Sequence, residues 1–297
     1  MKVGVIYPQI ELQGDPEAVR RIGLAAEELG YNHLLMYDHV VGAVHENRDP
    51  PLWGPYTDND PFHDPFVAFA YLAGITKNIQ FSTGVLILPQ RQTVLVAQQA
   101  ADLDLLSGGR LRLGVGTGWN YVEYDALGQD FRSRGRRLDE QVELLRRLWS
   151  EPLVTFEGEF DSIDRANINP RPKKAIPIWM GGFSEPAFRR GAQKGDGFIF
   201  AGSVDRDFTS GSTSVMSVLD GWERVKHHLK EAGRSAEGFG ADLAMLACRN
   251  PDEVADTLHR WQDAGGTHAS VMTMGLGFTH LDQHLDYMAE VQARLAL

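Results

Sequence analysis

An aspartate and a histidine stand side by side, Asp38 and His39, and Tyr37 separates them from the predicted strand His33–Met36. Imidazole titrates near neutral pH, so a histidine at the end of a strand can exchange a proton during a reaction. The neighbouring carboxylate can anchor the ring of a cofactor. The alternative is a capping aspartate beside a packed histidine. Because catalytic side chains of α/β barrels gather at strand ends, we predict His39 as the acid/base group and Asp38 as a cofactor-binding residue.

Two glycine-rich turns offer backbone N–H groups that no side chain obstructs. They are Gly116-Thr117-Gly118, which runs into Trp119, and Gly181-Gly182-Phe183-Ser184, which opens a predicted helix. A helix amino terminus with free amides is a favourable seat for a phosphate. Taken singly, each glycine pair is more typical of a tight turn. Both turns follow strands that we expect to be neighbours, and together they favour one phosphate-bearing ligand.

Short β-rich runs alternate with longer amphipathic segments along the whole chain. The expected strands are 2–7, 33–36, 79–88, 110–115, 176–180, 197–201, 242–247 and 268–272. Each is followed by apolar residues at helical spacing. The expected helices are 16–29, 65–77, 93–106, a segment around 138–149, 185–194, 214–232, 253–264 and 282–295. On the third helix, the spacing places Val96, Ala100, Leu103 and Leu106 on one face.

This alternation predicts an α/β protein with a single (β/α)8 TIM-barrel domain over residues 1–297, because right-handed helical crossovers between parallel strands close naturally. An open doubly wound sheet would favour a glycine fingerprint after the first strand, where this chain has Tyr7-Pro8-Gln9-Ile10. Insertions are expected after the second, fourth and sixth strands, at 40–64, 155–162 and 205–213. The active site of a barrel forms at the carboxyl ends of its strands.

Composition excludes several classes of function. The 297 residues are 43% hydrophobic, include one cysteine, Cys248, and carry a net charge of −11. Nucleic acid is an unsuitable partner, because its phosphates need clustered cations. One cysteine excludes an internal disulfide, and no run approaches the roughly 20 apolar residues of a membrane span. The amino terminus does not have the pattern of a signal peptide. We therefore expect a cytoplasmic protein that acts on a small molecule.

A metal-dependent hydrolase on the same fold is the main rival class. It would need histidine and carboxylate ligands at strand ends, and the first strand ends without such a pair. Asp58, Asp60 and Asp64 with His63 could bind a cation, but this spacing is more typical of a solvated loop. We expect no metal site. A barrel that has lost its cofactor and its activity is the third class.

The motifs at the strand ends, taken in order, resemble those of the bacterial luciferase-like superfamily, and most closely its branch that depends on the deazaflavin coenzyme F420. The most specific part runs from Ser107-Gly108-Gly109-Arg110 into Gly114-Val115-Gly116-Thr117-Gly118. The other matching segments are 27–31, 37–39, 82–86, 98–106, 156–158, 170–172, 177–182 and 195–197. The resemblance spans about residues 1–200 and implies an oxidoreductase of the luciferase-like barrel type.

The resemblance also implies roles for particular residues. Members of the superfamily carry a cis peptide bond that does not precede proline at the end of the third strand, where its bulge backs the central ring of the cofactor. Here that bond is Gly84–Val85, next to Thr83. The phosphate region of the cofactor falls on the two glycine turns. Asp38 would meet the ring system, and His39 matches the residue treated as the acid/base of deazaflavin-dependent dehydrogenases.

Short motifs bear on the choice of cofactor. Flavin-dependent relatives tend to have Glu-His-His after the second strand, and luciferase itself has an arginine in the turn after the fourth. This chain has Asp38-His39-Val40 and a neutral Thr117, which favour F420 and hydride transfer over oxygenation. FMN with monooxygenase chemistry is the alternative.

The insertions are expected to shape the substrate pocket. Trp53 and Tyr56 would wall it together with Trp119. Arg91 could meet an anionic group on cofactor or substrate, and a surface arginine at a helix start is an equal alternative. The resemblance further implies a homodimer.

Overall fold

The main sheet of the protein consists of parallel strands that hydrogen-bond to one another in a closed ring. The computed structural model describes residues 1–297 apart from 205–207, 211–212, 247–249 and 296–297. The strands of the main sheet follow the order β3-β2-β1-β13-β12-β9-β8-β5-β4, and β3 also pairs with β5. Because β3 and β4 share one position, the nine strands form a closed eight-position barrel. The predicted TIM barrel is confirmed.

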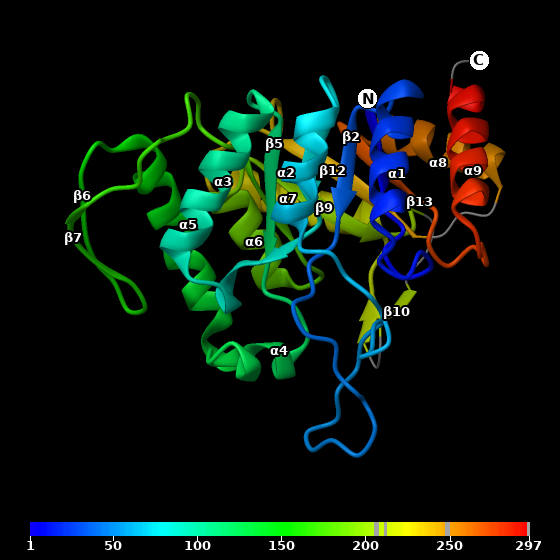
Figure 1. The fold of residues 1–297 in the computed structure, drawn as a ribbon. Helices are drawn as coiled ribbons and strands as arrows, with labels where there is room; N and C mark the ends of the chain where they lie inside the picture. Colours follow the sequence, from blue (N-terminus) through cyan, green and yellow to red (C-terminus); the bar gives the residue numbers. More distant parts are fainter. Residues whose placement is uncertain (205–207, 211–212, 247–249, 296–297) are drawn as a thin grey trace.

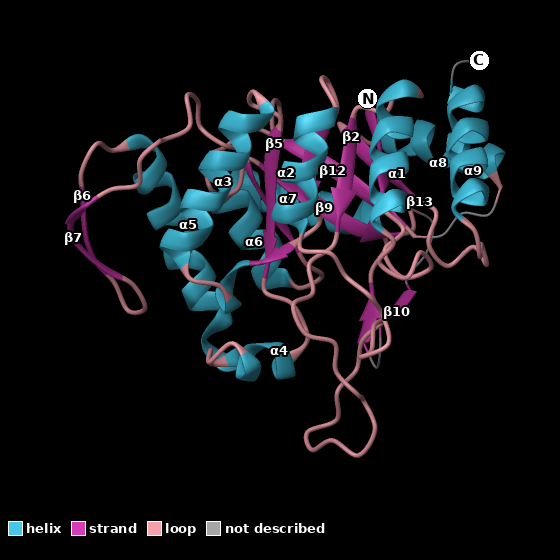
Figure 2. Ribbon diagram, in the orientation of Figure 1, coloured by secondary structure: helices cyan, strands magenta, loops and turns pink. Residues whose placement is uncertain are grey.

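The barrel strands alternate with helices that cover the outside. The strands are β1 (Lys2–Ile6), β2 (His33–Met36), β3 (Gln80–Thr83), β4 (Leu86–Ile87), β5 (Leu111–Gly116), β8 (Ile178–Gly181), β9 (Gly197–Gly202), β12 (Gly240–Met245) and β13 (His268–Met272). The α-helices are α1 (Pro16–Glu28), α2 (Pro65–Ile75), α3 (Thr93–Ser107), α4 (Tyr121–Ala126), α5 (Arg134–Ser150), α6 (Glu185–Lys194), α7 (Val218–Glu231), α8 (Pro251–Asp263) and α9 (Leu281–Leu295). Figure 2 shows the strands enclosed by these helices. No helix in the described ranges has the length and apolar character that crossing a membrane requires.

Two antiparallel hairpins lie outside the barrel. The expected hairpin after the fourth unit is β6 (Val154–Glu157) with β7 (Ser162–Ala166). The second is β10 (Phe208–Ser210) with β11 (Thr213–Val215), in the insertion after β9. Residues 205–207 and 211–212 of that insertion, and Cys248, lie outside the described residues. The helix expected at 214–232 begins at Val218, because Ser217 caps it through the backbone N–H of Asp220 at 3.2 Å.

Side chains inside the barrel form layers, because alternate residues of a strand point to opposite faces. Toward the amino ends the layer is polar and contains His33, Ser82, Arg112, Asp242 and Ser270. Above it lies a small apolar cluster of Ile6, Leu35, Trp179, Ile199, Ala244 and Met274. Toward the carboxyl ends, that cluster is covered by the partly buried Ile10, Tyr37, Val85, Ala201 and Met272. The barrel interior is therefore filled, and ligands are confined to its two ends.

The connecting segments divide between these ends. Figure 1 shows the long loop between β2 and α2, helix α4 and the β10 hairpin projecting together from the end where the strands finish. The amino terminus lies at the other end (Figure 1). The insertions thus converge on the barrel mouth at which barrel enzymes place their active sites.

Candidate active site

The loop between β2 and α2, residues 37–64, folds over the barrel mouth and packs on the segment after β5. Gly54 lies so close to Trp119 that a Cβ atom at position 54 would be 2.3 Å from the indole ring. The His45 ring lies against the same indole, with 5.9 Å between centroids. The Tyr121 hydroxyl donates to the carbonyl of Pro50 at 2.7 Å. The two loops therefore form one continuous wall.

His39, in the loop after β2, is hydrogen-bonded to a buried carboxylate in the segment after β5. Its Nδ1 lies 3.2 Å from Oε2 of Glu123, in α4. The other oxygen, Oε1, accepts the backbone N–H groups of Val40 and Val41 at 2.6 and 3.1 Å. Because a carboxylate can only accept, Nδ1 carries the proton and Nε2 of His39 is left to exchange a proton with a ligand. Glu123 is 1% exposed.

Helix α4 holds this carboxylate in place. Asn120 caps its amino terminus by accepting the backbone N–H of Val122 at 3.1 Å. Tyr124, on the same short helix, donates its hydroxyl to the carbonyl of Thr117 at 2.7 Å. The helix is thereby tied to the glycine turn that follows β5, and Glu123 is fixed relative to the barrel rather than to a free loop.

Aromatic rings surround the imidazole of His39. Their centroids lie 4.7 Å away for Phe62, 5.2 Å for Tyr56 and 5.6 Å for Trp119. Burial, with Tyr37, Asp60 and Glu11 nearby, raises the pKa of Tyr56 well above its usual value, so its phenol stays neutral. Two of the predicted pocket residues, Tyr56 and Trp119, therefore lie beside His39, whereas Trp53 is 62% exposed on the outside of the loop.

Between β3 and β4 the chain forms a bulge at Gly84–Val85, and this peptide bond is cis, as the resemblance implied. The side chain of Val85 lies over the ends of the next two strands. A Cβ atom on Gly116 would be 2.5 Å from Val85 Cγ2, and one on Gly181 would be 2.6 Å from Val85 Cγ1. Glycine is therefore required at both positions by the bulge itself. The strand predicted as one run over 79–88 is divided at this point.

Asp38 is buried in an ion pair. Arg91 donates to its Oδ1 at 2.6 Å, and the backbone N–H of Ile87 donates to its Oδ2 at 2.9 Å. Arg91 also contacts Asp64, the cap of α2, at 3.2 Å. Burial opposes the charge of Arg91, but the two carboxylates raise its pKa above the usual value. Asp38 and Arg91 thus brace β4, β2 and α2 together, and direct contact of either with a ligand stays a prediction.

The two predicted phosphate turns lie at the ends of β5 and β8, which pair in parallel. Gly118 and Gly182 have φ of 62° and 149°, where a side chain is disfavoured. After Gly182, the exposed Phe183 and Ser184 lead into α6, whose amino terminus has no side-chain cap. An uncapped helix terminus beside side-chain-free backbone fits the phosphate of a flavin-type cofactor.

The family is decided by a comparison with known families. Luciferase-like monooxygenases match residues 2–239 of the sequence. The chain belongs to the luciferase-like monooxygenase family. The resemblance seen in the strand-end motifs is thereby confirmed, and the protein is an oxidoreductase.

Relatives of this luciferase-like protein include enzymes named for different reactions, a monooxygenase and a dehydrogenase. An uncharacterized protein of Mycobacterium tuberculosis is 36% identical over 216 residues, 71% of each chain. Pyrimidine monooxygenase RutA of Allorhizobium ampelinum is 33% identical over 198 residues, 65% of this chain and 51% of that one. An F420-dependent glucose-6-phosphate dehydrogenase of Amycolatopsis mediterranei is 28% identical over 244 residues, 80% of this chain and 68% of that one.

Solved structures share the fold of this luciferase-like protein. An F420-dependent secondary alcohol dehydrogenase has a TM-score of 0.77 and 16% identity, and the match covers 98% of this chain and 97% of that one. A type II Baeyer–Villiger monooxygenase from Pseudomonas putida, in complex with FMN, has a TM-score of 0.63 and 17% identity over 88% of this chain and 71% of that one. At such identities the likeness shows the barrel fold alone.

Sequence reasoning did not find Glu123 or Phe62, the residues that orient and enclose His39 in this luciferase-like barrel. The available signal for Glu123 was the capping pattern Asn120-Tyr121-Val122-Glu123, which predicts a helix start. Nothing in that pattern shows that the carboxylate meets the loop after the second strand. Among the described residues, no group of three or more His, Cys, Asp or Glu side chains is arranged to hold a metal.

Proposed function

We propose that this luciferase-like protein transfers hydride between coenzyme F420 and a small organic substrate at the barrel mouth. The observation that carries the proposal is the bond between His39 and the buried Glu123. When hydride leaves or reaches a carbon that bears oxygen, one proton must also move, and a histidine oriented by a carboxylate is suited to move it. Relatives named F420-dependent glucose-6-phosphate dehydrogenases, such as that of Amycolatopsis mediterranei, support this choice of cofactor.

Three groups of residues would hold the cofactor. Val85, in the bulge between β3 and β4, would back the ring system. The turn from Gly116 to Trp119 and the turn from Gly181 to Ser184 would bind the phosphate and the chain that carries it. When bound, a deazaflavin supplies two-electron hydride chemistry, and the protein supplies orientation.

The residues of the chain divide the remaining work. Glu123 fixes the tautomer of His39, so that Nε2 can exchange the proton with the substrate oxygen. Tyr56, Phe62 and Trp119 exclude water from the imidazole, which strengthens polar interactions at the site. The pair of Asp38 and Arg91 positions the ends of β2 and β4, on which His39 and the bulge depend.

The proposal is tested by titrating the purified protein with F420 and with FMN while following fluorescence quenching, and then by following F420 turnover with a panel of alcohols and aldehydes. We expect F420 to bind more tightly. The variant His39→Ala should keep F420 binding and lose about 10²- to 10⁴-fold in the rate of hydride transfer, the range of one acid/base group. His227→Ala, an exposed histidine of α7, serves as the matched control.

Two results would contradict parts of this proposal. Tight FMN binding with NADH-driven oxygen uptake would replace it with the FMN-dependent monooxygenase. A His39→Ala variant that turns over F420 at the rate of the control would remove the acid/base role while leaving the choice of cofactor intact.

A further inference from the structure

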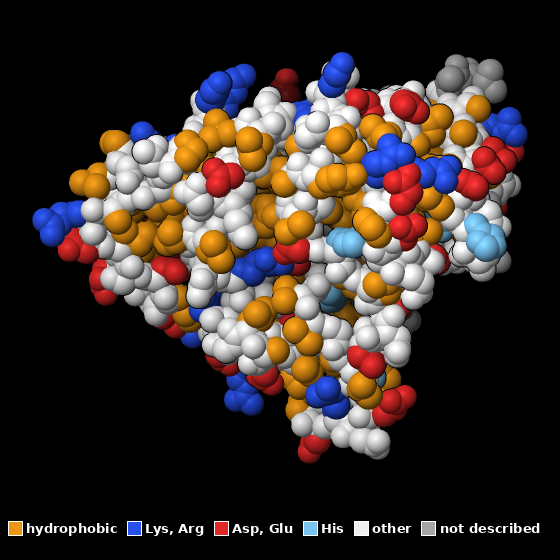
Figure 3. All heavy atoms as spheres, in the orientation of Figure 1, with side chains coloured by type: hydrophobic (Ala, Val, Ile, Leu, Met, Phe, Trp, Pro, Cys, Tyr) orange, Lys and Arg blue, Asp and Glu red, His pale blue; other side chains and the backbone are white. Residues whose placement is uncertain are grey.

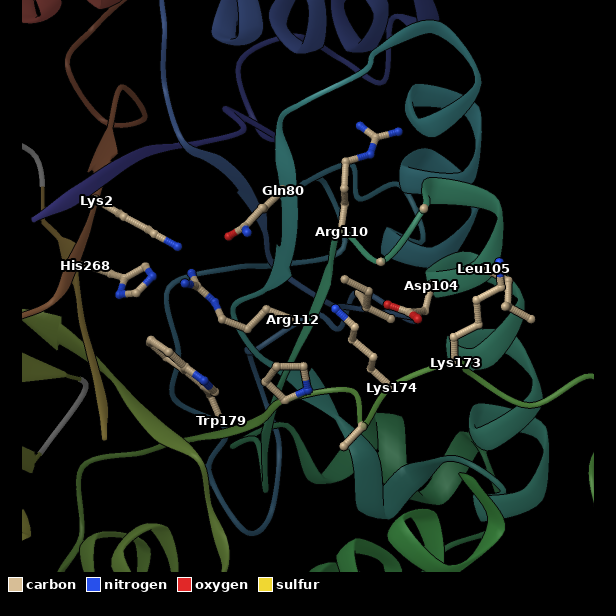
Figure 4. A pocket seen from close by; sticks show the side chains of 15 residues that line it. Lys2, Gln80, Asp104, Leu105, Arg110, Arg112, Lys173, Lys174, Trp179 and His268 are labelled. Atoms are coloured by element: carbon tan, nitrogen blue, oxygen red, sulfur yellow. The ribbon is translucent and has the colours of Figure 1, made fainter. Parts of the chain in front are cut away.

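A cavity of about 520 Å³ lies at the amino-terminal end of the barrel, the end opposite His39. It is lined by residues at the starts of four strands and by the segment that precedes β8. Figure 4 shows Lys2, His268 and the guanidinium of Arg112 directed toward one another, with Gln80 beyond Lys2 and Lys174 entering from the opposite side. This cavity is independent of the hydride-transfer proposal.

Positive charge dominates the lining, although the whole chain carries a net charge of −11. The basic residues that line the cavity are Lys2, Arg110, Arg112, Lys173 and Lys174, against the single carboxylate of Asp104. Arg110 turns its guanidinium away, toward backbone carbonyls (Figure 4). In the described part of the chain, ion pairs of lysine involve Lys194 and Lys226, and none involves the three lysines of the cavity.

The same lysines extend the positive surface beyond this cavity. Lys173 and Lys174 also line a second, adjoining cavity of about 730 Å³. Arg146 and Arg171 line it as well, and it has no carboxylate in its lining. Arg112 is paired with Asp242 and Arg146 with Asp196, but the three lysines have no ion pair within the described ranges, and clustered like charges repel one another.

Arg112 supplies the second observation. Its side chain is 6% exposed; Nε donates to Ser82 Oγ at 3.1 Å and Nη2 donates to Asp242 at 2.6 Å. The third nitrogen, Nη1, is buried and has no acceptor. Leaving a buried charged donor without an acceptor is unfavourable, so such a group needs an explanation. Arg112 lines the cavity, so an anionic ligand there would supply an acceptor for this guanidinium.

We propose that this cavity binds the phosphate group of a small metabolite. Two of the five N–H groups of Arg112 are engaged by Ser82 and Asp242, and the other donors of the cavity come from separate side chains. The donors come from four strands, through Lys2, Gln80, Arg112 and His268, and from Lys174 in the segment before β8. Such a set can surround a tetrahedral oxyanion. The volume exceeds that of one phosphate and lies within the range of small-molecule sites.

The neutral state of His268 fits this arrangement. Burial, together with the charges of Arg112 and Lys2 and against the opposing effect of Asp242, lowers the pKa of His268 to about 3. A neutral imidazole can donate one N–H without adding another charge to repel the lysines. His268 Nδ1 lies 2.9 Å from Thr267 Oγ1; when that hydroxyl donates to Nδ1 rather than to the carbonyl of Ala241, Nε2 carries the ring N–H.

The cavity is separated from the barrel mouth by packed side chains. Trp179 lies between the two ends, and a Cβ atom on Gly240 would be 1.9 Å from its ring and one on Gly197 would be 2.5 Å from it. Arg112 stacks on the same indole, with its Cζ 4.2 Å from a ring centroid. A ligand of this cavity therefore cannot be a part of a cofactor bound at the mouth.

The test is calorimetric titration of the full chain with inorganic phosphate and with glycerol 3-phosphate, at constant ionic strength and with acetate as the planar-anion probe. We expect saturable binding of both phosphates and none of acetate, with the ester binding more tightly if the site takes a metabolite. Lys2→Ala and Lys174→Ala, both exposed residues, should each weaken binding about ten-fold, the loss of one charge-assisted contact. Lys230→Ala, on the surface of α7, removes the same charge elsewhere and should bind as wild type.

Three outcomes would overturn the proposal. The first is the absence of saturable binding by either phosphate. The second is equal weakening by Lys2→Ala, Lys174→Ala and the Lys230→Ala control, which would indicate a general effect of net charge. The third is loss of phosphate binding when cofactor saturates the barrel mouth, which would place the phosphate in the cofactor site.

Discussion

The position of one proton on one ring decides what His39 can do. Glu123 accepts from three donors, the imidazole Nδ1 and two backbone N–H groups of the loop after β2. Through these three hydrogen bonds it both orients the histidine and holds the loop in place. A neutral amide at this position could satisfy the same donors only in part, because it has one accepting oxygen.

We expect Glu123→Gln to lower the rate of hydride transfer by about ten- to a hundred-fold, less than removal of the acid/base group itself. Cofactor affinity should change little, because Glu123 does not line the glycine turns. The measurement is the single-turnover rate of F420 in the variant and in wild type. A variant that reacts as fast as wild type would remove the orienting role of Glu123.

Single residues mark how far sequence reasoning reaches at the site. The position of His39 at the barrel mouth was predictable because it follows a strand that ends there, a local feature. Glu123 was not, because its meeting with His39 depends on how two insertions fold against each other. Asp38 was predicted as a group that meets the ring, and the structure describes it bound to Arg91. This ion pair joins two elements that are far apart in the chain, and the spacing of residues in the sequence does not predict it.

At the scale of elements, hydrophobic periodicity predicted the eight strand–helix units because each unit has its own local signal. The division of the third strand into β3 and β4 escaped that signal, since β-branched residues typical of strands stand on both sides of Gly84. The predicted face of α3 also differs at Leu106. Its spacing placed it on one face with Val96 and Leu103, which are buried, and the structure leaves it 75% exposed.

The bulge at Val85 packs against the ends of β5 and β8. A substitution at Gly181 tests whether this packing stabilises the barrel mouth. In Gly181→Ala the new methyl group would lie 2.6 Å from Val85 Cγ1, so Val85 must shift. We expect a destabilisation of about 1–3 kcal/mol, typical of overpacking, together with weaker cofactor binding. Urea unfolding and cofactor titration measure the two effects.

The matched control is Gly221→Ala, within α7, where the added Cβ atom would make ordinary contacts of 3.4 and 3.5 Å. That variant should be as stable as wild type or slightly more so, because alanine favours a helix over glycine. If Gly181→Ala matched it in stability and affinity, the packing of Val85 over the strand ends would not govern the mouth.

At the scale of the whole molecule, α2 and α3 expose an apolar face. We propose that a second copy of the chain covers it. Along α2, Val67, Tyr71 and Ile75 recur at intervals of four and are 70%, 48% and 40% exposed. Leu95 and Leu106 on the neighbouring α3 are 52% and 75% exposed. Figure 3 shows apolar side chains gathered over the face where these helices lie in Figure 1. A patch of this kind is typical of an interface between proteins.

We expect the wild-type chain to sediment as a homodimer at micromolar concentration, because α2 and α3 of one copy can cover the same helices of another in a self-complementary contact. Val67→Glu and Leu106→Glu should each shift the protein toward monomer, since a buried unpaired carboxylate at the centre of an interface is costly. Leu153→Glu, at an apolar position that is 56% exposed between α5 and β6, introduces the same charge away from this face. Analytical ultracentrifugation of wild type and the three variants measures the oligomeric state. A monomeric wild type would show that a second copy of the chain does not cover this face. Dimers that persist in both the α2 and the α3 variant would show the same.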